Sequence, residues 1–287
     1  MPELPFLEVL AENMTGRVLG RRIESITIRQ PALLQTTAPA PESFAGEFVG
    51  LVRREGKYLI VETETRRVLV LHLMRLGRLD VVTPAPGRAR AIPKNTSAVV
   101  RFDDGSELRL TEHGTEKRAR LWLAEDAGDV PELASLGPDP TRGGLDRGPF
   151  LAALRAESRQ LKSFLVDQRV LSGIGNGLSD EILWEARLSP LSLTPRVSDE
   201  EADRLREAVG RVAAEQVNRL RASAAGAVPR REPSDLYAVH DHAGEPCPRC
   251  GTAIARISYA DRETFYCPGC QTGGKPLKDR RLSRLLR

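Results

Sequence analysis

The sequence predicts an α+β protein built from several parts, and three observations support this fold class. Residues 1 to about 130 contain one short helical pattern followed by runs of β-branched and aliphatic residues that suit strands. From residue 150 to residue 222 the apolar positions change to helical spacing. All four cysteines lie together near the C-terminus, which indicates a separate small module there.

Length and composition narrow the class of protein further. A chain of 287 residues is longer than a single hydrophobic core usually grows, so we expect two domains. The 43 Lys and Arg exceed the 39 Asp and Glu, and this net charge of +4 permits a nucleic-acid partner without requiring one. The sequence has no apolar run of roughly 18 residues and no secretory signal pattern. Four cysteines are too few for a disulfide scaffold, so we expect a cytoplasmic protein.

The N-terminal part begins with a helix and continues as strands. Phe6, Leu7 and Leu10 fall at helical spacing, and Gly16 predicts the end of that helix. The turn residues Asp103–Gly105 separate two apolar runs and are typical of a β-hairpin. Strands are predicted over residues 22–29, 58–62, 68–73, 98–102, 107–110 and 121–123.

The remaining chain is predicted to be mainly helical. Residues 126–149 are rich in proline and glycine, which favours a linker. Ser198 followed by Glu201 forms a capping-box pattern at the start of the longest helix. We expect residues 223–236 to be a short flexible stretch. Helices are predicted over residues 150–156, 159–168, 179–186 and 199–222.

The cysteine module has the spacing of a metal site. Cys247 and Cys250 form one C-x-x-C pair, Cys267 and Cys270 form another, and sixteen residues separate the pairs. Zn²⁺ prefers four thiolates in a tetrahedron, and each tight C-x-x-C turn brings two of them to one ion. The alternatives are two redox dithiols or four buried thiols. The spacing favours a structural zinc ion, whose binding would supply much of the folding energy of this module.

A glycine-rich segment, Ser172–Gly177, lies between two of the predicted helices. No strand precedes it, which excludes a dinucleotide-binding fingerprint. Two interpretations remain open. Its backbone N–H groups, together with the amide of Asn176, would bind a phosphate at the start of a helix. Alternatively, the glycines only allow two helices to pack closely at a corner.

The first residues suggest a nucleophile. Removal of Met1 would leave Pro2 with a free secondary amine, and α-amino groups have a pKa of about 8, so part of this amine is unprotonated near neutral pH. Glu3 stands beside it and would serve as a general acid. Many proteins begin with Met-Pro for no chemical reason, so this pattern gains meaning only in combination with others.

In combination, these features resemble the formamidopyrimidine-DNA glycosylase / endonuclease VIII family over residues 1 to about 271. The features are Pro2-Glu3-Leu4-Pro5, the β-rich first half, the segment from Leu165 to Glu181, and the four-cysteine module ending in Thr264-Phe265-Tyr266-Cys267. The resemblance implies a β-sandwich domain with a leading helix (1–130), a linker (131–149), a helix–two-turn–helix domain (150–236), a zinc finger (237–271) and a basic tail (272–287).

The resemblance also implies a function. It predicts a base-excision repair DNA glycosylase with AP lyase activity that acts as a monomer on damaged double-stranded DNA held in a cleft between the two domains. The cell compartment implied is a bacterial-type cytoplasm, at the nucleoid. The only cofactor implied is a structural Zn²⁺. The alternative is a lyase-only or catalytically weak protein that binds abasic or distorted DNA.

Site residues follow from the same resemblance. The Pro2 nitrogen would attack the deoxyribose C1′ and form an imine, and β- or β,δ-elimination would then nick the strand. Glu3 would protonate the sugar ring oxygen, and Lys57 would contact a phosphate near the lesion. The residues implied to bind DNA from the C-terminal half are Asn176, Lys162 and Arg262.

The sequence departs from the family pattern around the lesion. Phe6 stands where the family usually has a glutamate that helps to hold a damaged purine. Because this contact is lost, the sequence does not specify which damaged base the protein prefers. The tail contains six basic residues, which either add phosphate contacts or keep the chain soluble. These residues are Lys275, Lys278, Arg280, Arg281, Arg284 and Arg287.

The residues that fill the gap left by a flipped nucleotide also differ. Arg75 stands where the void-filling methionine usually lies, with Met74 one residue earlier. Arg118 matches the arginine that faces the orphaned base, and the usual intercalating phenylalanine would be Ala119. We expect Arg75, Met74 or Leu121 to fill the gap, or the protein to act on DNA that is already distorted.

Overall fold

The chain divides into two compact units. The first unit comprises Met1–Ser135 and Leu220–Glu232, and the second comprises Leu136–Arg219 and Pro233–Arg287. Helix α6 (Asp199–Ala224) begins in the second unit, and its last residues belong to the first. The computed structural model describes residues 1–83, 91–233, 235–259 and 262–278.

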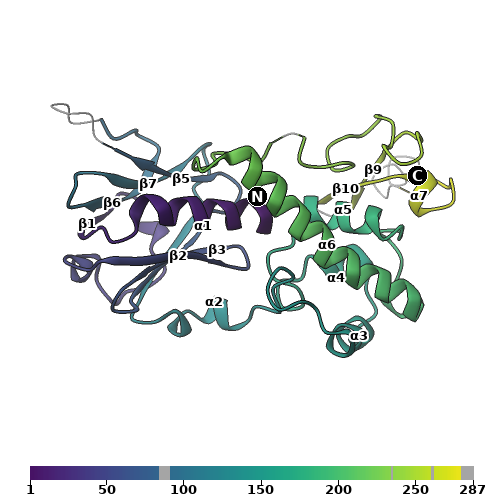
Figure 1. Cartoon of the computed structure of the whole chain (residues 1–287), viewed down its shortest axis with the longest axis horizontal. Coiled ribbons are helices and arrows are strands. Elements are labelled where there is room, and N and C mark those ends of the chain that lie inside the picture. The colour runs from purple at the N-terminus through teal and green to yellow at the C-terminus, as the bar shows by residue number, and fades with distance from the viewer. Residues whose placement is uncertain (84–90, 234, 260–261, 279–287) are drawn as a thin grey trace. The chain divides into compact units, whose positions relative to one another are not determined.

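The first unit is a β-sandwich made of two four-stranded antiparallel sheets (Figure 1), which confirms the predicted fold class. One sheet has the strand order β1-β6-β7-β5, and the other has the order β2-β3-β4-β8. The strands are β1 (Ile23–Ile28), β2 (Val49–Glu55), β3 (Tyr58–Thr63), β4 (Val68–His72), β5 (Gly77–Val82), β6 (Thr96–Phe102), β7 (Glu107–Glu112) and β8 (Arg120–Ala124). The helical elements are α1 (Leu4–Val18), η1 (Pro31–Leu33), η2 (Pro41–Phe44), η3 (Ala127–Asp129) and α2 (Pro131–Ala134).

Two of these strands, β2 and β5, are absent from the sequence prediction. In β2 the apolar pattern is interrupted by Arg53 and Arg54, whereas β5 shows only a short alternation with two polar residues, Arg78 and Asp80. Arg54 is nevertheless fully buried, because an acidic partner from α1 compensates its charge. A strand prediction based on hydrophobicity misses a segment in which a charged residue is buried because it is paired.

Helix α1 is buried along most of its length. Its predicted end at Gly16 is wrong, because the helix continues to Val18 and the chain turns only at Gly20, which has a φ of 70°. The hydroxyl of Thr15 contacts the edge strand β2, where the Val52 amide donates to it at 3.0 Å and the Val52 carbonyl lies 2.8 Å away. The helix is therefore joined directly to a strand edge.

The second unit is mainly helical and carries a β-hairpin near its C-terminal end (Figure 1). The predicted capping box at the start of α6 is confirmed: Glu201 N donates to Ser198 Oγ at 3.2 Å, and Ser198 N donates to Glu201 Oε2 at 3.0 Å. No helix among the described residues is long and apolar enough to cross a membrane. The other elements are α3 (Arg147–Ala156), α4 (Leu161–Leu165), α5 (Asn176–Glu185), η4 (Thr194–Arg196), β9 (Ala255–Tyr259), β10 (Arg262–Tyr266) and α7 (Pro268–Gln271).

Two predicted segments differ from the structure. The helix expected over 159–168 is helical only from Leu161 to Leu165, because the residues after it form a turn. The stretch expected over 223–236 begins inside α6, and its residues up to Glu232 belong to the first unit, where they make hydrogen bonds. In the basic tail, Lys275 and Lys278 are described, whereas the four arginines from residue 280 onward lie outside the described residues.

Candidate functional site

The N-terminus lies at the start of the buried helix α1. Pro2 is buried, Glu3 is 5% exposed, and Met1 is 49% exposed. Glu3 is the N-cap residue of α1, with extended backbone angles, and its side chain makes no capping hydrogen bond. Instead its backbone N–H donates to Glu232 Oε1 at 3.1 Å. Met1 is thus accessible for removal, while Pro2 and Glu3 are held in place.

Lys57 lies in the tight turn between β2 and β3, directly after Gly56, whose φ is 53°. The buried Arg54 ties this turn to α1, because its guanidinium donates to Glu8 Oε2 at 2.7 Å and to the Gly56 carbonyl at 3.0 Å. Lys57 is only 7% exposed. The ion pair of the buried Arg54 with the partly exposed Glu8 therefore fixes the turn that carries Lys57 against the helix that carries the N-terminus.

Next to Lys57 lies a histidine that is kept neutral. Burial, followed by the positive charges of Lys57 and Arg120, lowers the pKa of His72 to about 4. The Met74 N–H donates to His72 Nδ1 at 3.1 Å, so in the neutral ring the proton resides on Nε2. This bond supports the turn in which Met74 has a left-handed φ of 51°. Neutral His72 thus shapes the turn that presents Met74 and Arg75.

The candidate gap-filling residues lie on two adjoining loops. His113 N donates to the Leu76 carbonyl at 3.1 Å and joins the loop after β4 to the loop after β7. Met74 is half-buried and Arg75 is exposed. Leu121, the third residue expected to fill the gap, is the second residue of β8 and is only 2% exposed.

The second of these loops is organised by Glu112, a carboxylate that is 2% exposed. Its Oε1 accepts the backbone N–H groups of Arg118 at 2.7 Å and Ala119 at 2.8 Å, and its Oε2 accepts the Ser97 hydroxyl at 2.7 Å. Arg118 is exposed and pairs with Glu116 at 2.7 Å. Ala119 is buried, so its methyl group does not project from this position as a wedge.

In the second unit, a glutamine shapes the glycine-rich turn before α5. Gln168 Nε2 donates to the carbonyls of Val166 at 2.9 Å and Ile174 at 2.8 Å, and its Oε1 accepts from Gly173 N at 2.9 Å. Gly173 has a φ of 86°, which only glycine adopts readily. These bonds fix the conformation of the turn, after which α5 begins at Asn176. The turn therefore has a specific internal scaffold.

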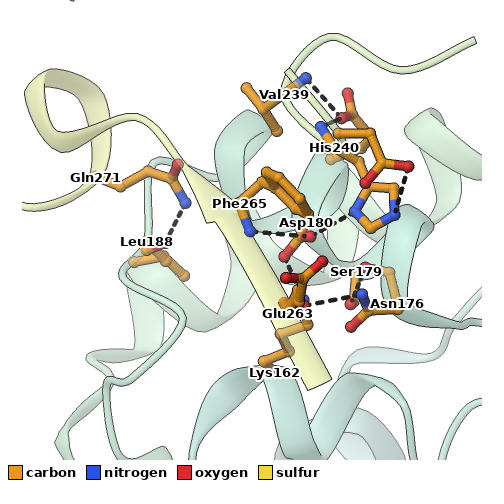
Figure 2. Close-up of polar contacts among 12 residues, drawn as sticks. Lys162, Asn176, Ser179, Asp180, Leu188, Val239, His240, Glu263, Phe265 and Gln271 are labelled. Carbon is orange, nitrogen blue, oxygen red and sulfur yellow. Dashed lines mark hydrogen bonds and ion pairs between the residues drawn. The ribbon is translucent and has the colours of Figure 1, made fainter. Parts of the chain in front are cut away.

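Two polar side chains and one backbone N–H meet inside the second unit around a single carboxylate (Figure 2). Asp180 is 1% exposed, and its Oδ1 accepts from Lys162 Nζ at 2.5 Å. Its Oδ2 accepts from Phe265 N at 3.2 Å and lies 2.8 Å from His240 Nδ1. The carboxylate joins α4, α5, β10 and the segment before the cysteine module. Lys162 is thus placed inside the protein, 5% exposed.

The carbonyl of Glu263 on β10 is held by two of the candidate DNA-binding residues. Lys162 Nζ donates to it at 3.0 Å, and Asn176 Nδ2 donates to it at 2.9 Å (Figure 2). Arg262, the preceding residue, begins β10. The structure therefore brings Lys162 and Asn176 to the same strand that carries Arg262.

The next residue of α5, Glu181, secures the segment leading to the cysteine module. It is 4% exposed, and its carboxylate accepts the backbone N–H groups of Ala238, Val239 and His240 at 2.8–2.9 Å. Burial raises the pKa of Glu181, although these three N–H donors favour the charged form. Two successive carboxylates of α5 thus attach the C-terminal module to the helix that begins at Asn176.

The four cysteines are arranged to bind one metal ion. The sulfur atoms of Cys247, Cys250, Cys267 and Cys270 all lie within 4.8 Å of one another. Sulfur atoms bound tetrahedrally to zinc at about 2.3 Å are separated by about 3.8 Å. The sulfur–sulfur separations of 3.9 Å for Cys247–Cys270 and 3.4 Å for Cys250–Cys267 fit this arrangement. The donor set and the geometry both fit a structural Zn²⁺, as predicted.

The metal site is supported by residues around it. Trp184 Nε1 donates to Cys247 Sγ at 3.4 Å, and Arg249 lies over the Trp184 ring at 3.9 Å. A Cβ atom on Gly269 would lie 2.6 Å from Thr252 Oγ1 and 3.1 Å from Cys250 Sγ. A side chain at this position of the second cysteine turn would therefore have to displace the Thr252 hydroxyl.

Several of these functional contacts are invisible to sequence reasoning. Glu112 and Glu232 each act on backbone N–H groups, and nothing in their sequence neighbourhood marks them. Arg54 looks like an ordinary charged residue of a strand. Asp180 and Glu181 carry a weak signal, because two successive acids precede the apolar residues of a helix that follows a glycine-rich turn.

Comparison with protein families covers most of the chain. Residues 1–115 match the formamidopyrimidine-DNA glycosylase N-terminal domain. Residues 136–225 match the formamidopyrimidine-DNA glycosylase H2TH domain, and residues 244–273 match a zinc finger found in FPG and IleRS. These three matches follow one another in the order expected from the sequence.

Individual relatives agree with the family matches. The formamidopyrimidine-DNA glycosylase of Symbiobacterium thermophilum is 34% identical over 279 residues, which cover 94% of this chain and 89% of the relative. The crystal structure of Lactococcus lactis FPG (MutM) with FAPY-dG containing DNA has a TM-score of 0.83 and 26% identity, and the match covers 94% of this chain and 100% of that one. For MutM (FPG) of Thermus thermophilus the TM-score is 0.79, the identity is 30%, and the coverage is 96% and 100%.

Proposed function

The chain belongs to the formamidopyrimidine-DNA glycosylase family, and from this membership we propose that its N-terminal proline is the nucleophile with which it excises damaged bases. The protein is a base-excision repair DNA glycosylase with AP lyase activity, and its partner is damaged double-stranded DNA. The observation that carries the proposal is the placement of Pro2 and Glu3, which are buried and held at the start of α1 under an accessible Met1.

The proposed reaction begins when Met1 has been removed. The Pro2 lone pair attacks C1′ of the flipped nucleotide, and the bond from C1′ to the damaged base breaks. The base leaves with the electron pair of that bond and takes up a proton. Glu3 gives a proton to the ring oxygen O4′ as the bond from C1′ to O4′ breaks, and the nitrogen loses its proton, so that the iminium forms. The positive end of the α1 dipole favours the neutral amine over the ammonium, which supports attack.

Strand cleavage follows from the iminium. Loss of a proton from C2′ expels the 3′ phosphate by β-elimination, because the iminium accepts the electron pair. A second elimination at the 5′ side would release the sugar. Hydrolysis of the imine then regenerates the Pro2 amine. Lys57, in the turn tied to α1, would neutralise a phosphate next to the reacting sugar.

Further DNA contacts are proposed for the second unit. The Asn176 amide and the N-terminus of α5 would hold a phosphate, with Arg262 beside them on β10. Lys162 would act through Asp180 and the Glu263 carbonyl, which it contacts, by holding that strand in place. The four cysteines would hold a Zn²⁺ that stabilises the hairpin and takes no part in the chemistry.

The gap left by the flipped nucleotide would be filled from the first unit. Arg75 is exposed and Met74 is half-buried on one turn, and both would enter the space between the neighbouring bases. Arg118, exposed on the adjoining loop, would face the orphaned base. The relatives are bacterial proteins, and we place this enzyme in the bacterial cytoplasm at the nucleoid. We also propose that the β-sandwich domain ends at residue 130, the linker at 149, the helix–two-turn–helix domain at 236 and the zinc finger at 271.

One observation favours a second candidate function, in which the protein cleaves abasic sites without excising bases. Phe6 is 2% exposed and packed in the core of the first unit. It therefore offers no hydrogen bond to a lesion, although the reacting residues Pro2 and Glu3 are retained. The two functions are separated by their substrates.

The test is covalent trapping. Purified protein is mixed with a duplex that contains one abasic site, borohydride is added, and the adduct is separated by denaturing gel electrophoresis. Intact-mass measurement checks that Met1 is removed. Pro2→Leu is the matched variant, because a bulky second residue retains Met1 and leaves position 2 without a free amine. We expect trapping by the wild-type protein and none by this variant.

Trapping that persists in Pro2→Leu would contradict the proposal. A panel of lesions then separates the two functions. It includes FAPY-dG, 8-oxoguanine and an oxidised pyrimidine, because relatives have been solved with DNA containing these groups. Excision of at least one base shows the glycosylase, and cleavage of abasic DNA alone shows the lyase-only protein.

A further inference from the structure

The end of helix α6 and the segment that follows it lie along helix α1. Arg221 pairs with Glu12 at 2.6 Å, and Asn13 Nδ2 donates to the Ala227 carbonyl at 2.7 Å. Glu232 then reaches the backbone of Glu3. The segment thus follows α1 from its middle to its first residue. All these residues belong to the first compact unit.

The segment between these contacts is short, since Ala227 and Glu232 are only five residues apart. A further anchor is the ion pair of Arg230 with Asp80 on β5, at 2.9 Å.

The contact of Glu232 falls at a sensitive position. The first N–H groups of a helix have no intrahelical acceptor, and the side chain of Glu3 makes no capping bond. The Glu232 carboxylate accepts the Glu3 N–H at 3.1 Å and adds a negative charge where the helix dipole favours one. It therefore caps α1 from a residue 229 positions away in the sequence.

This cap also orients the residue before it. The nitrogen of Glu3 belongs to the peptide plane that includes the carbonyl of Pro2. Fixing that N–H fixes the plane, and with it the direction in which the proline ring leaves the helix. The side chain of Glu3 is attached to Cα, the atom bonded directly to this nitrogen. One hydrogen bond thus restrains both of the residues that the reaction uses.

We propose that Glu232 is a positioning residue for the N-terminal nucleophile, holding the Pro2–Glu3 peptide plane so that the amine and the carboxyl reach the same sugar. This inference rests on the proposed function of Pro2. Its role requires a hydrogen-bond acceptor at this place, and a negative charge is secondary. Glutamine, whose Oε1 accepts in the same way, should therefore replace it, whereas alanine should not.

The experiment compares Glu232→Ala, Glu232→Gln and the wild-type protein at saturating abasic duplex. The trapping rate with borohydride reports attack, and fluorescence anisotropy without borohydride reports binding. A misplaced nucleophile costs about 100-fold in rate. We expect Glu232→Ala to trap about 10- to 100-fold more slowly, with Kd changed by less than about 2-fold, and Glu232→Gln to stay within about 3-fold of the wild type.

The matched control is Arg221→Gln, which removes an anchor of the same segment without touching Glu232. Its trapping rate should stay within about 2-fold of the wild type. A loss equal to that of Glu232→Ala would assign the effect to folding of the whole segment and overturn the inference. An unchanged Glu232→Ala, or a Glu232→Gln that is equally slow, would also overturn it. Failure of the wild-type protein to trap DNA would instead overturn the proposed function.

Discussion

Replacing Asp180 by asparagine should destabilise the second unit more than removing the charge of its partner Lys162. The Asp180 side chain is fully buried, and its carboxylate accepts hydrogen bonds from Lys162, His240 and the Phe265 N–H. An asparagine offers one acceptor oxygen in place of two, so its NH₂ group would face at least one of these three donors. Lys162 would also keep a buried charge without its counter-ion.

The magnitude follows from the burial of both partners. Removing one member of a buried ion pair costs about 3–5 kcal/mol. Lys162 keeps its bond to the Glu263 carbonyl, which places Asp180→Asn near the lower end, at about 3 kcal/mol. Lys162→Met should cost less, about 2 kcal/mol, because the carboxylate keeps two N–H donors. The double variant should lose less than the sum, since the two residues interact directly.

The assay is urea unfolding followed by tryptophan fluorescence. The chain has two tryptophans, and Trp122→Phe leaves Trp184 as a reporter of the second unit. The free energy of unfolding is measured for both single variants and the double variant in this background. Losses below about 1 kcal/mol for Asp180→Asn, or strictly additive losses, would refute the reasoning.

Three further predictions concern single contacts. The pKa of His72 is about 4 in the folded protein and about 6.5 in the unfolded chain. The free energy of unfolding should therefore fall by about 3 kcal/mol as the pH falls from 6.5 to 4. His72→Asn should abolish this fall in acid titrations monitored by circular dichroism. Trp184→Phe removes the N–H bonded to Cys247 and should weaken zinc binding about 10-fold in chelator competition. Gly177→Ala places a Cβ 2.7 Å from Tyr237 Cζ, and should cost about 1–3 kcal/mol in urea unfolding.

Each of these has a clear counter-result. An acid profile of His72→Asn identical to that of the wild type would show that another group causes the fall. Equal zinc affinity in Trp184→Phe would show that the N–H to sulfur contact is unimportant. Gly148→Ala is the matched control for Gly177→Ala, because an added Cβ there meets nothing within 4 Å and should not destabilise helix α3.

Local chemistry made part of this molecule predictable. The zinc site follows from two short spacings, and the start of α6 follows from Ser198 and Glu201, because each set of partners lies within a few residues in the sequence. The strands β3 and β4 are predicted correctly because aliphatic residues dominate their sequences. The predicted helix end at Gly16 fails because tertiary packing of α1 carries the helix past a weak local signal.

The remaining features depend on partners that are distant in the sequence. The burial of Arg54 requires Glu8, and the position of Lys57 depends on both. The contact of Glu232 joins residues 229 positions apart. No periodicity encodes such pairs, because each depends on how the elements pack. The family resemblance supplied the roles proposed for Pro2 and Glu3, and the structure supplied the contact that holds their backbone.

The contact between Thr15 and strand β2 has a consequence for how the protein behaves at high concentration. A sheet edge with unpaired backbone groups accepts strands from other molecules and so nucleates aggregates. In β2 the Val49 backbone is bonded to Gly20 and Arg21, and both backbone groups of Val52 meet the Thr15 hydroxyl. One hydroxyl and one turn thus block intermolecular strand addition where the sandwich would otherwise be open.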